Sequence, residues 1–201
     1  MVVLDVETTG LDPVKNTILE IGAIDFYNPE YQFYGRCRMD ERFEIDSKAL
    51  AINGYSEKDL FDSTKPTLGQ MLKDFKEWVL KIKDRTLAGQ NVSFDMAILS
   101  NSAKVNGVNL QLGYRNIDQH SLAYSLCIKY GINIPLENGI SALNGDRIMS
   151  LVGLPEEPRP HSGINGAKYQ AEAISRMVYG RSLLPEFSTY KIPDYSKIKV
   201  I

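Results

Sequence analysis

An apolar run at the start of the chain carries two carboxylates, and this feature constrains the fold more than any other. Asp5 lies within the aliphatic stretch 2–6 and Glu7 directly follows it, in a segment that otherwise has the composition of a buried β-strand. Successive side chains of a strand point to opposite faces, so residues two apart share a face at roughly 6–7 Å from each other. Both carboxylates therefore point to the same side of the predicted strand.

Two neighbouring carboxylates in an apolar strand need a source of positive charge, because burying paired negative charges is strongly unfavourable unless cations neutralise them. Mg²⁺ prefers oxygen ligands, and two such ions about 3.5–4 Å apart need carboxylates that lie close together. Asp5 and Glu7 thus indicate a metal site. The alternative is a strand that ends at a solvated edge with two ordinary surface acids, and the short pattern by itself favours neither.

Composition and charge narrow the class of protein. A chain of 201 residues with 43% hydrophobic content is long enough for one well-buried domain. Cys37 and Cys127 are far apart and belong to no cluster of metal ligands, which suits a reducing compartment. The N-terminus has no signal-like core, and no apolar run approaches the ~18 residues that span a bilayer. We therefore expect a cytoplasmic protein that does not use the membrane.

The net charge of −2 argues against a large basic surface that binds nucleic acid electrostatically. It does not exclude an enzyme that acts on nucleic acid, because an acidic cluster that holds metal ions presents a locally positive site to phosphate. The overall charge is therefore a weak discriminator between these classes.

Strand-like runs and amphipathic helices are arranged along the whole chain. We predict strands at 1–7, 17–26, 31–38, 86–89 and 116–118. We predict helices at 47–53, 56–59, 67–83, 95–106, 121–130, 141–152 and from 162 to about 180. Ser141 is the expected cap of the helix that reaches Val152. The last helix has a stripe of small and aliphatic residues suited to close packing on a sheet, namely Ile164, Ala167, Ala171, Ile174 and Val178.

Two further polar residues have an ordinary structural explanation when each is taken alone. Asp95 lies at a predicted strand-to-helix junction, where an acid commonly interacts with the helix N-terminus. His161 lies in a loop just before the last helix, where a histidine often bonds to the backbone. Asp118 is most simply a helix cap, and His120 has no motif around it.

Taken together, three segments resemble the motifs of the DEDDh exonucleases, the family of bacterial polymerase proofreading subunits (DNA polymerase III epsilon) and of ribonuclease T. The first motif is Leu4–Leu11, the second is Asn91–Asp95, and the third begins at His161. The stretch Ala51–Leu60 also resembles the family's segment after its first three strands. Joint occurrence in the right order is far more specific than any single motif.

The resemblance implies an α/β fold of the RNase H-like type, with a mixed five-stranded sheet flanked by helices. Three of the strands form an antiparallel portion, which agrees with the strand order predicted above. The exonuclease domain is expected over 1–180. Residues 181–201 are expected to form a C-terminal extension, either packed or a mobile arm.

The resemblance also implies a 3′-to-5′ exonuclease that releases nucleoside monophosphates from single-stranded DNA or RNA ends with two Mg²⁺ or Mn²⁺ ions. In that scheme Asp5 bridges both metals, Glu7 helps to hold the metal that carries the attacking water, and Asp95 supports the second site. His161 is the general base. The residues that fall where the family contacts the terminal nucleotide are Thr8, Thr9, Leu11, Asn91 and Phe94. A polymerase or another replication factor is a candidate partner.

One position departs from the family's pattern. The family has an aspartate five residues after the histidine, whereas this chain has Gly166. Glu172 is a poor substitute, since six residues at about 100° each place it some 240° around the helix. Asn165 adjoins the gap and could offer a neutral amide oxygen, and a water molecule could also fill the space.

Loss of one anionic ligand is expected to weaken chiefly the metal that carries the attacking water. Two classes of function remain: an active exonuclease with an altered metal requirement, and a catalytically weak nucleic-acid binding module. We favour the enzyme because the other four motif residues are all present.

Overall fold

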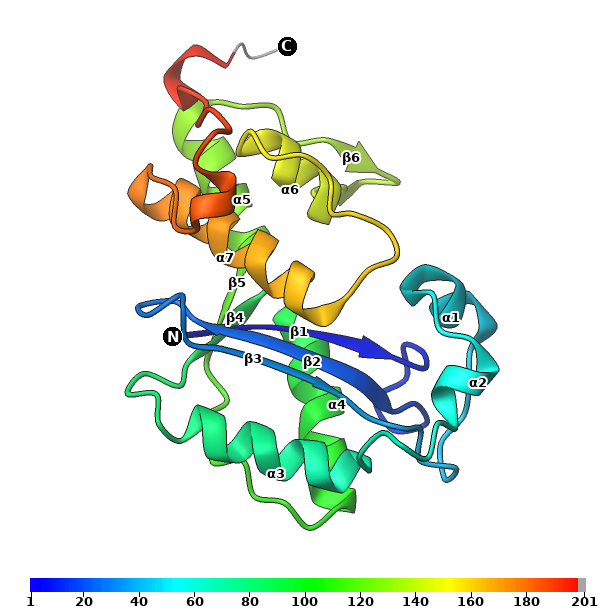
Figure 1. Cartoon of the computed structure of the whole chain (residues 1–201). Coiled ribbons are helices and arrows are strands. Elements are labelled where there is room, and N and C mark those ends of the chain that lie inside the picture. Colours follow the sequence, from blue (N-terminus) through cyan, green and yellow to red (C-terminus); the bar gives the residue numbers. More distant parts are fainter. Residues whose placement is uncertain (199–201) are drawn as a thin grey trace.

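The computed structural model describes residues 1–198 and consists of a five-stranded sheet with helices on both faces (Figure 1). The strands are β1 (Val2–Thr8), β2 (Ile18–Asp25), β3 (Gln32–Arg36), β4 (Leu87–Gly89) and β5 (Asn116–Asp118). Their order in the sheet is β3-β2-β1-β4-β5. The pairs β1–β2 and β2–β3 are antiparallel, whereas β1–β4 and β4–β5 are parallel. This confirms the predicted mixed sheet with an antiparallel three-strand portion.

Helices cover both faces of the sheet, with α3 and α4 on one face and α7 on the other (Figure 1). The helices are α1 (Ser47–Asn53), α2 (Glu57–Leu60), α3 (Leu68–Val79), α4 (Val92–Val105), α5 (Gln119–Tyr130), α6 (Gly145–Leu151) and α7 (Gly163–Tyr179). Two 3₁₀ turns follow, η1 (Pro185–Phe187) and η2 (Tyr195–Lys197). In the described part of the chain no helix is long and apolar enough to cross a membrane.

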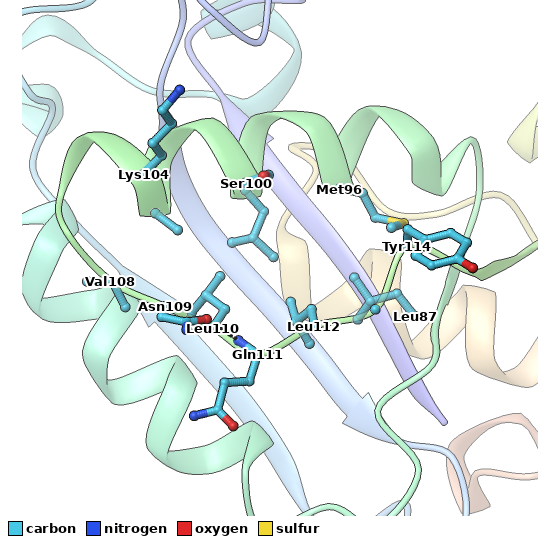
Figure 2. Close-up of a pocket in the computed structure, with 13 residues that line it drawn as sticks. Leu87, Met96, Ser100, Lys104, Val108, Asn109, Leu110, Gln111, Leu112 and Tyr114 are labelled. Atoms are coloured by element: carbon cyan, nitrogen blue, oxygen red, sulfur yellow. Dashed lines mark hydrogen bonds between the residues drawn. The ribbon is translucent and has the colours of Figure 1, made fainter.

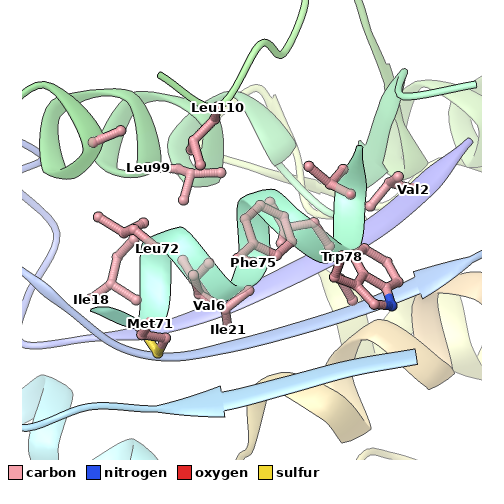
Figure 3. Packing of buried hydrophobic residues seen from close by; sticks show 14 of the residues in the cluster. Val2, Val6, Ile18, Ile21, Met71, Leu72, Phe75, Trp78, Leu99 and Leu110 are labelled. Atoms are coloured by element: carbon pink, nitrogen blue, oxygen red, sulfur yellow. The ribbon is translucent and has the colours of Figure 1, made fainter. Parts of the chain in front are cut away.

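Side chains of β1 alternate between the two faces of the sheet, and this alternation decides which face carries Asp5 and Glu7. Val2 and Val6 belong to the core under α3, where Figure 3 shows them near Phe75 and Trp78. Val3, between them, belongs to the second core, under α7. Asp5 and Glu7 have the same parity as Val3, and both line a cavity beside α7. The prediction that they share a face is confirmed.

At the N-terminus of α7 the helix backbone packs directly against the backbone of the sheet. A Cβ atom added to Gly22 of β2 would lie 2.0 Å from the carbonyl carbon of Gly163, so only glycine fits at this crossing. The contact brings the start of α7 over the centre of the sheet. The predicted stripe holds at Ala167, Ala171 and Ile174, which are buried, but Val178 is 51% exposed and lies off it.

Most predicted helix boundaries agree with the structure to within a few residues. Ser56 forms a capping box with Asp59, Thr67 caps α3, and Asp118 caps α5 through a bond from the Ser121 N–H. Gly54 ends α1 in the left-handed conformation. These local signals decide where each helix begins or ends.

The prediction that Ser141 caps a helix was wrong. Ser141 ends the second strand of a small hairpin, β6 (Leu136–Glu137) and β7 (Ile140–Ser141), and Asn144 caps α6 instead. The Ser141 hydroxyl lies 2.9 Å from Nε2 of His120. The turn residues Asn138 and Gly139 both have positive φ. An Asn-Gly pair is the strongest short signal for a hairpin, and it outweighs the serine as a cap signal.

Residues 181–198 pack along α7 through a buried ion pair. Arg176 and Glu172 are fully buried, and the guanidinium donates to the backbone carbonyls of Phe187 and Tyr190. Glu172 accepts backbone N–H bonds from residues 183 and 184. The domain boundary at residue 180 stays a prediction, and residues 199–201 of the expected extension lie outside the described residues.

Candidate active site

A polar cavity of about 320 Å³ lies between β1 and the start of α7. Asp5, Glu7 and His161 line it, together with Gly166 and Gln170 of α7. The structure thus brings together three of the four residues predicted to be catalytic. No lysine or arginine among the described residues lines this cavity, so its acids have no cationic side chain in front of them.

Asp5 is the most constrained of these side chains. Its Oδ1 accepts a hydrogen bond of 2.9 Å from Nε2 of Gln170. Burial raises the pKa of Asp5 well above its usual range, and the charges of Asp95, Glu7 and Glu157 raise it further, while the Gln170 bond opposes the shift. An ionised Asp5 is therefore strongly destabilised unless a cation compensates for its charge.

Asp95 lies behind the cavity rather than in its lining. It belongs to the first turn of α4, is only 5% exposed, and accepts a 3.2 Å hydrogen bond from the backbone N–H of Val6. This bond ties the start of α4 to β1 between the two strand carboxylates. Burial raises the pKa of Asp95 to about 7. The charge of Asp95 raises the pKa of Asp5 and Glu7, so Asp95 belongs to their electrostatic cluster.

The pKa of Glu7 is also raised far above its usual value. Burial raises the pKa of Glu7 to about 8, and the charges of Glu20, Glu157 and Asp95 contribute. Glu20 on β2 is itself bound to Arg36 at 3.0 Å and to the Gly163 N–H at 3.1 Å. The guanidinium of Arg36 is thus already engaged by Glu20.

His161 lines the cavity from the segment before α7, with 29% of its side chain exposed. Its Nδ1 lies 3.9 Å from Oε2 of Glu157, which is beyond hydrogen-bond distance. The imidazole is therefore accessible from the cavity, and among the described residues no backbone group forms a hydrogen bond with it.

Gly166 lies where the sequence comparison placed the missing carboxylate. A Cβ atom added to it would lie 2.0 Å from Oδ2 of Asp5 and 2.6 Å from its Cγ. The position faces Asp5, and the Asp5 carboxylate uses the space that a side chain at 166 would need.

The five predicted nucleotide contacts lie outside the cavity lining. Thr9 is fully buried, and its hydroxyl bonds to the Glu44 carbonyl at 2.7 Å. Leu11 is 78% exposed, Asn91 precedes α4 with a positive φ of 51°, and Phe94 packs against the core under α3. Thr8, nearly buried, bonds to the carbonyl of residue 10. Their roles at a substrate stay predictions.

Sequence reasoning missed Glu157 and Gln170, which both line the cavity. Gln170 follows Gly166 by four residues, one helical turn, so its position on the same side of α7 could have been inferred. Glu157 lies in a proline-rich loop, and no periodicity indicates where such a side chain points.

A larger cavity, of about 550 Å³, lies between α4 and the segment 108–114 (Figure 2). Its lining is mainly aliphatic, including Leu99, Leu110 and Leu112. Lys104 is its one charged residue among those described. It contains no carboxylate or histidine and has no part in the chemistry of the acidic cavity.

The chemistry of the acidic cluster fits a hard divalent cation. Within residues 1–198, no three Asp, Glu, His or Cys side chains converge closely enough here to form a ready-made metal site. The donors are nevertheless carboxylate oxygens, the kind that Mg²⁺ and Mn²⁺ prefer. Desolvated acids with raised pKa values, and a buried Oε1 of Glu157 without a hydrogen-bond partner, are the groups that such a cation stabilises.

Two bacterial DNA polymerase III proteins are similar in sequence to this chain. DNA polymerase III PolC-type of Thermotoga maritima is 26% identical over 199 residues, which cover 98% of this chain and 13% of that protein. DNA polymerase III subunit epsilon of Rickettsia prowazekii is 37% identical over 105 residues, 49% of this chain and 42% of that protein. This chain therefore spans less than half the length of either relative.

A solved structure shares the fold. The zinc-ion-bound form of the E. coli exonuclease I complex with single-stranded DNA has a TM-score of 0.69 and 15% identity, over 88% of this chain and 39% of that one. The fold is thus the RNase H-like exonuclease fold. The model of the exonuclease family (RNase T) matches residues 2–172. With that much of its length matched, the chain belongs to the DEDD-type 3′–5′ exonuclease family.

Proposed function

We propose that this protein is a metal-dependent 3′–5′ exonuclease that hydrolyses phosphodiester bonds at single-stranded DNA or RNA ends and releases nucleoside monophosphates. The observation that carries the proposal is the convergence of Asp5, Glu7 and His161 on one cavity, with Asp95 directly behind it. Membership of the exonuclease family supports the same reaction.

Each residue has a role that its position allows. Asp5, Glu7 and Asp95 would hold the divalent cations, Mg²⁺ or Mn²⁺. When bound, such ions supply positive charge to the attacking and leaving oxygens of the displacement. His161 takes the proton from the attacking water, because its ring lines the cavity and an imidazole nitrogen can accept a proton from a bound water. Gln170 fixes Asp5 through their hydrogen bond.

The test uses single-stranded oligonucleotides labelled at the 5′ end, one of DNA and one of RNA, with Mg²⁺ and then Mn²⁺. A 3′–5′ exonuclease yields a ladder of shortening labelled products, whereas cleavage from the 5′ end releases the label at once. Asp5→Asn serves as the inactive control. An intact substrate under all four conditions would reject the enzyme assignment.

A second candidate is a nucleic-acid binding module of the same fold with little catalysis. The observation that favours it is Gly166, which leaves the cavity without the carboxylate of the family's third motif. Fluorescence anisotropy with the same oligonucleotides separates the two functions. Binding without any product would establish the module, and binding with a product ladder would establish the enzyme.

We also infer a role next to a polymerase, supported by the two polymerase III relatives. An exonuclease that needs a single-stranded end acts faster on a frayed, mismatched primer terminus than on a paired one. The measurement compares initial rates on primers that differ only in the terminal base pair. Equal rates on both would argue against a proofreading role.

A further inference from the structure

The cavity lacks a carboxylate from α7 but receives one from another element. Glu157 lies in the loop between α6 and α7, four residues before His161, and lines the same cavity as Asp5 and Glu7. Only 15% of its side chain is exposed. Three residues earlier the loop is anchored, since Leu154 is buried and its N–H bonds to the Met149 carbonyl at 2.8 Å.

The carboxylate of Glu157 is incompletely satisfied in this position. Its Oε1 is buried and has no hydrogen-bond partner among the described residues. The backbone N–H of Ser162 bonds to the carboxylate, and Oε2 lies 3.9 Å from Nδ1 of His161. A buried carboxylate oxygen without a donor is strongly unfavourable unless a cation is its partner. Glu157 lines the same cavity as Asp5 and Glu7, and its charge contributes to the raised pKa of both acids.

Most of the other candidate donors are engaged elsewhere or lie outside the cavity lining. Glu172 forms the buried ion pair with Arg176, and Glu20 is held by Arg36. Asn165 does not line the cavity. Asp146, on the first turn of α6, does line it and raises the pKa of Glu157, but it is not among the charges that chiefly raise the pKa of Asp5 and Glu7.

We propose that Glu157 supplies the fourth acidic ligand for the divalent cations, in place of the carboxylate that Gly166 lacks. The proposal deepens the proposed function, on which it rests. The acidic set is then Asp5, Glu7, Asp95 and Glu157, so the fourth acid comes from the loop before the histidine and not from the helix after it. This arrangement also explains why a glycine is tolerated at 166, because the charge that the site requires is retained.

The experiment measures metal binding without substrate. Metal-free protein is titrated with Mn²⁺ by isothermal calorimetry, for the parent, Glu157→Gln and Asp146→Asn. Glu157→Gln keeps the shape and removes the charge, and Asp146→Asn is the matched control in the same cavity. We expect Glu157→Gln to weaken Mn²⁺ binding about tenfold or more, the scale of losses around metal sites, and Asp146→Asn to leave it nearly unchanged.

The outcomes separate this proposal from the proposed function. Equal Mn²⁺ affinity in Glu157→Gln and the parent overturns the proposal, as a role limited to orienting His161 would give that result. A parent that binds no Mn²⁺ overturns it as well. A parent that binds Mn²⁺ through Glu157 but degrades no oligonucleotide supports the proposal and rejects the nuclease. If Glu157→Gln does not fold, Glu157→Asp is used instead. It keeps the negative charge on a side chain that is shorter by one methylene, and weaker Mn²⁺ binding is expected for this variant too.

Discussion

Gln170 holds Asp5 in place from one turn beyond Gly166. Its Nε2 donates to Oδ1 of Asp5 at 2.9 Å, and its Oε1 accepts the backbone N–H of Gln90 at 3.0 Å. The amide thereby connects α7, β1 and the end of β4 at the cavity. Because both amide atoms are engaged, the orientation of the Asp5 carboxylate depends on this one side chain.

We expect Gln170→Leu to weaken divalent-metal binding by about tenfold to a hundredfold while the fold persists, because Asp5 loses the bond that orients it. Calorimetry with Mn²⁺ measures the loss, and circular dichroism checks the fold. Gln170→Glu has nearly the same shape but adds a negative charge beside Asp5, so the metal-free protein should melt at a lower temperature. Unchanged Mn²⁺ affinity in Gln170→Leu would show that Asp5 is oriented by other contacts.

Asp5→Asn should abolish exonuclease activity and leave the metal-free melting temperature unchanged or higher. The charge is needed to hold the cations, whereas in their absence it repels the neighbouring carboxylates and is desolvated. The measurements are the initial rate on a labelled oligonucleotide and thermal melting in EDTA. Full residual activity would contradict the assignment of Asp5 as a metal ligand.

His161→Gln should lower the chemical rate by about 10²–10⁴-fold, the usual contribution of a positioned proton acceptor. Mn²⁺ affinity should change little, because His161 is assigned to the water and not to the metals. His120→Gln is the matched control, since His120 contacts Ser141 on the hairpin and does not line the cavity. Single-turnover rates distinguish the two variants, and a parental rate in His161→Gln would leave this histidine without a chemical role.

The metal-free protein should lose stability as pH rises from about 5 to about 8. Burial raises the pKa of Glu7 to about 8 and that of Asp95 to about 7 in the folded state, whereas carboxyl groups in the unfolded chain titrate near 4. Between these values the folded state binds more protons, so the free energy of unfolding falls as pH increases. Urea unfolding in EDTA at several pH values measures the slope.

Controls identify the groups behind that slope. Glu7→Gln should flatten the profile, and the exposed Glu77→Gln on α3 should not. Mg²⁺ should also flatten it, since bound cations favour the ionised carboxylates. A stability that is constant from pH 5 to pH 8 in the metal-free parent would mean that the carboxylates are better solvated than their burial indicates.

Strand periodicity predicted the meander of β1 to β3, and local start or stop signals predicted most of the helices. The mixed five-stranded sheet, with β4 and β5 added in parallel, was what the resemblance to the exonuclease family implied. The shared face of Asp5 and Glu7 followed from the period of a strand alone. Glu157 could not be predicted, since its loop has no period and its direction depends on packing between distant segments. The hairpin at Asn138 was predictable from its turn residues but was overlooked in favour of the serine cap.

The last prediction concerns position 166. Gly166→Asp should tighten Mn²⁺ binding and lower the Mg²⁺ concentration needed for activity, because the new carboxylate faces Asp5 and its charge is expected to outweigh the loss of the bond between Gln170 and Asp5. In the metal-free protein its Cβ would lie 2.0 Å from Asp5 Oδ2, so the Asp5 carboxylate must rotate away and release Gln170. We therefore expect a lower melting temperature in EDTA and a larger rise on adding Mn²⁺ than in the parent. Helix propensity differs by only a few tenths of a kcal/mol between glycine and aspartate and does not decide the result.

The double variant Glu157→Gln with Gly166→Asp tests whether residues 157 and 166 bind the same cations. If both positions serve the same cations, the aspartate should restore most of the Mn²⁺ affinity that the glutamine removes, and the two effects should not be independent. Calorimetry on the parent, both single variants and the double variant gives the coupling. Strictly additive effects on Mn²⁺ affinity would mean that residues 157 and 166 act on separate features of the cavity. A Gly166→Asp protein that neither binds Mn²⁺ more tightly nor melts at a lower temperature in EDTA would contradict the prediction for position 166. That result would show that the Asp5 carboxylate does not occupy the space beside this position.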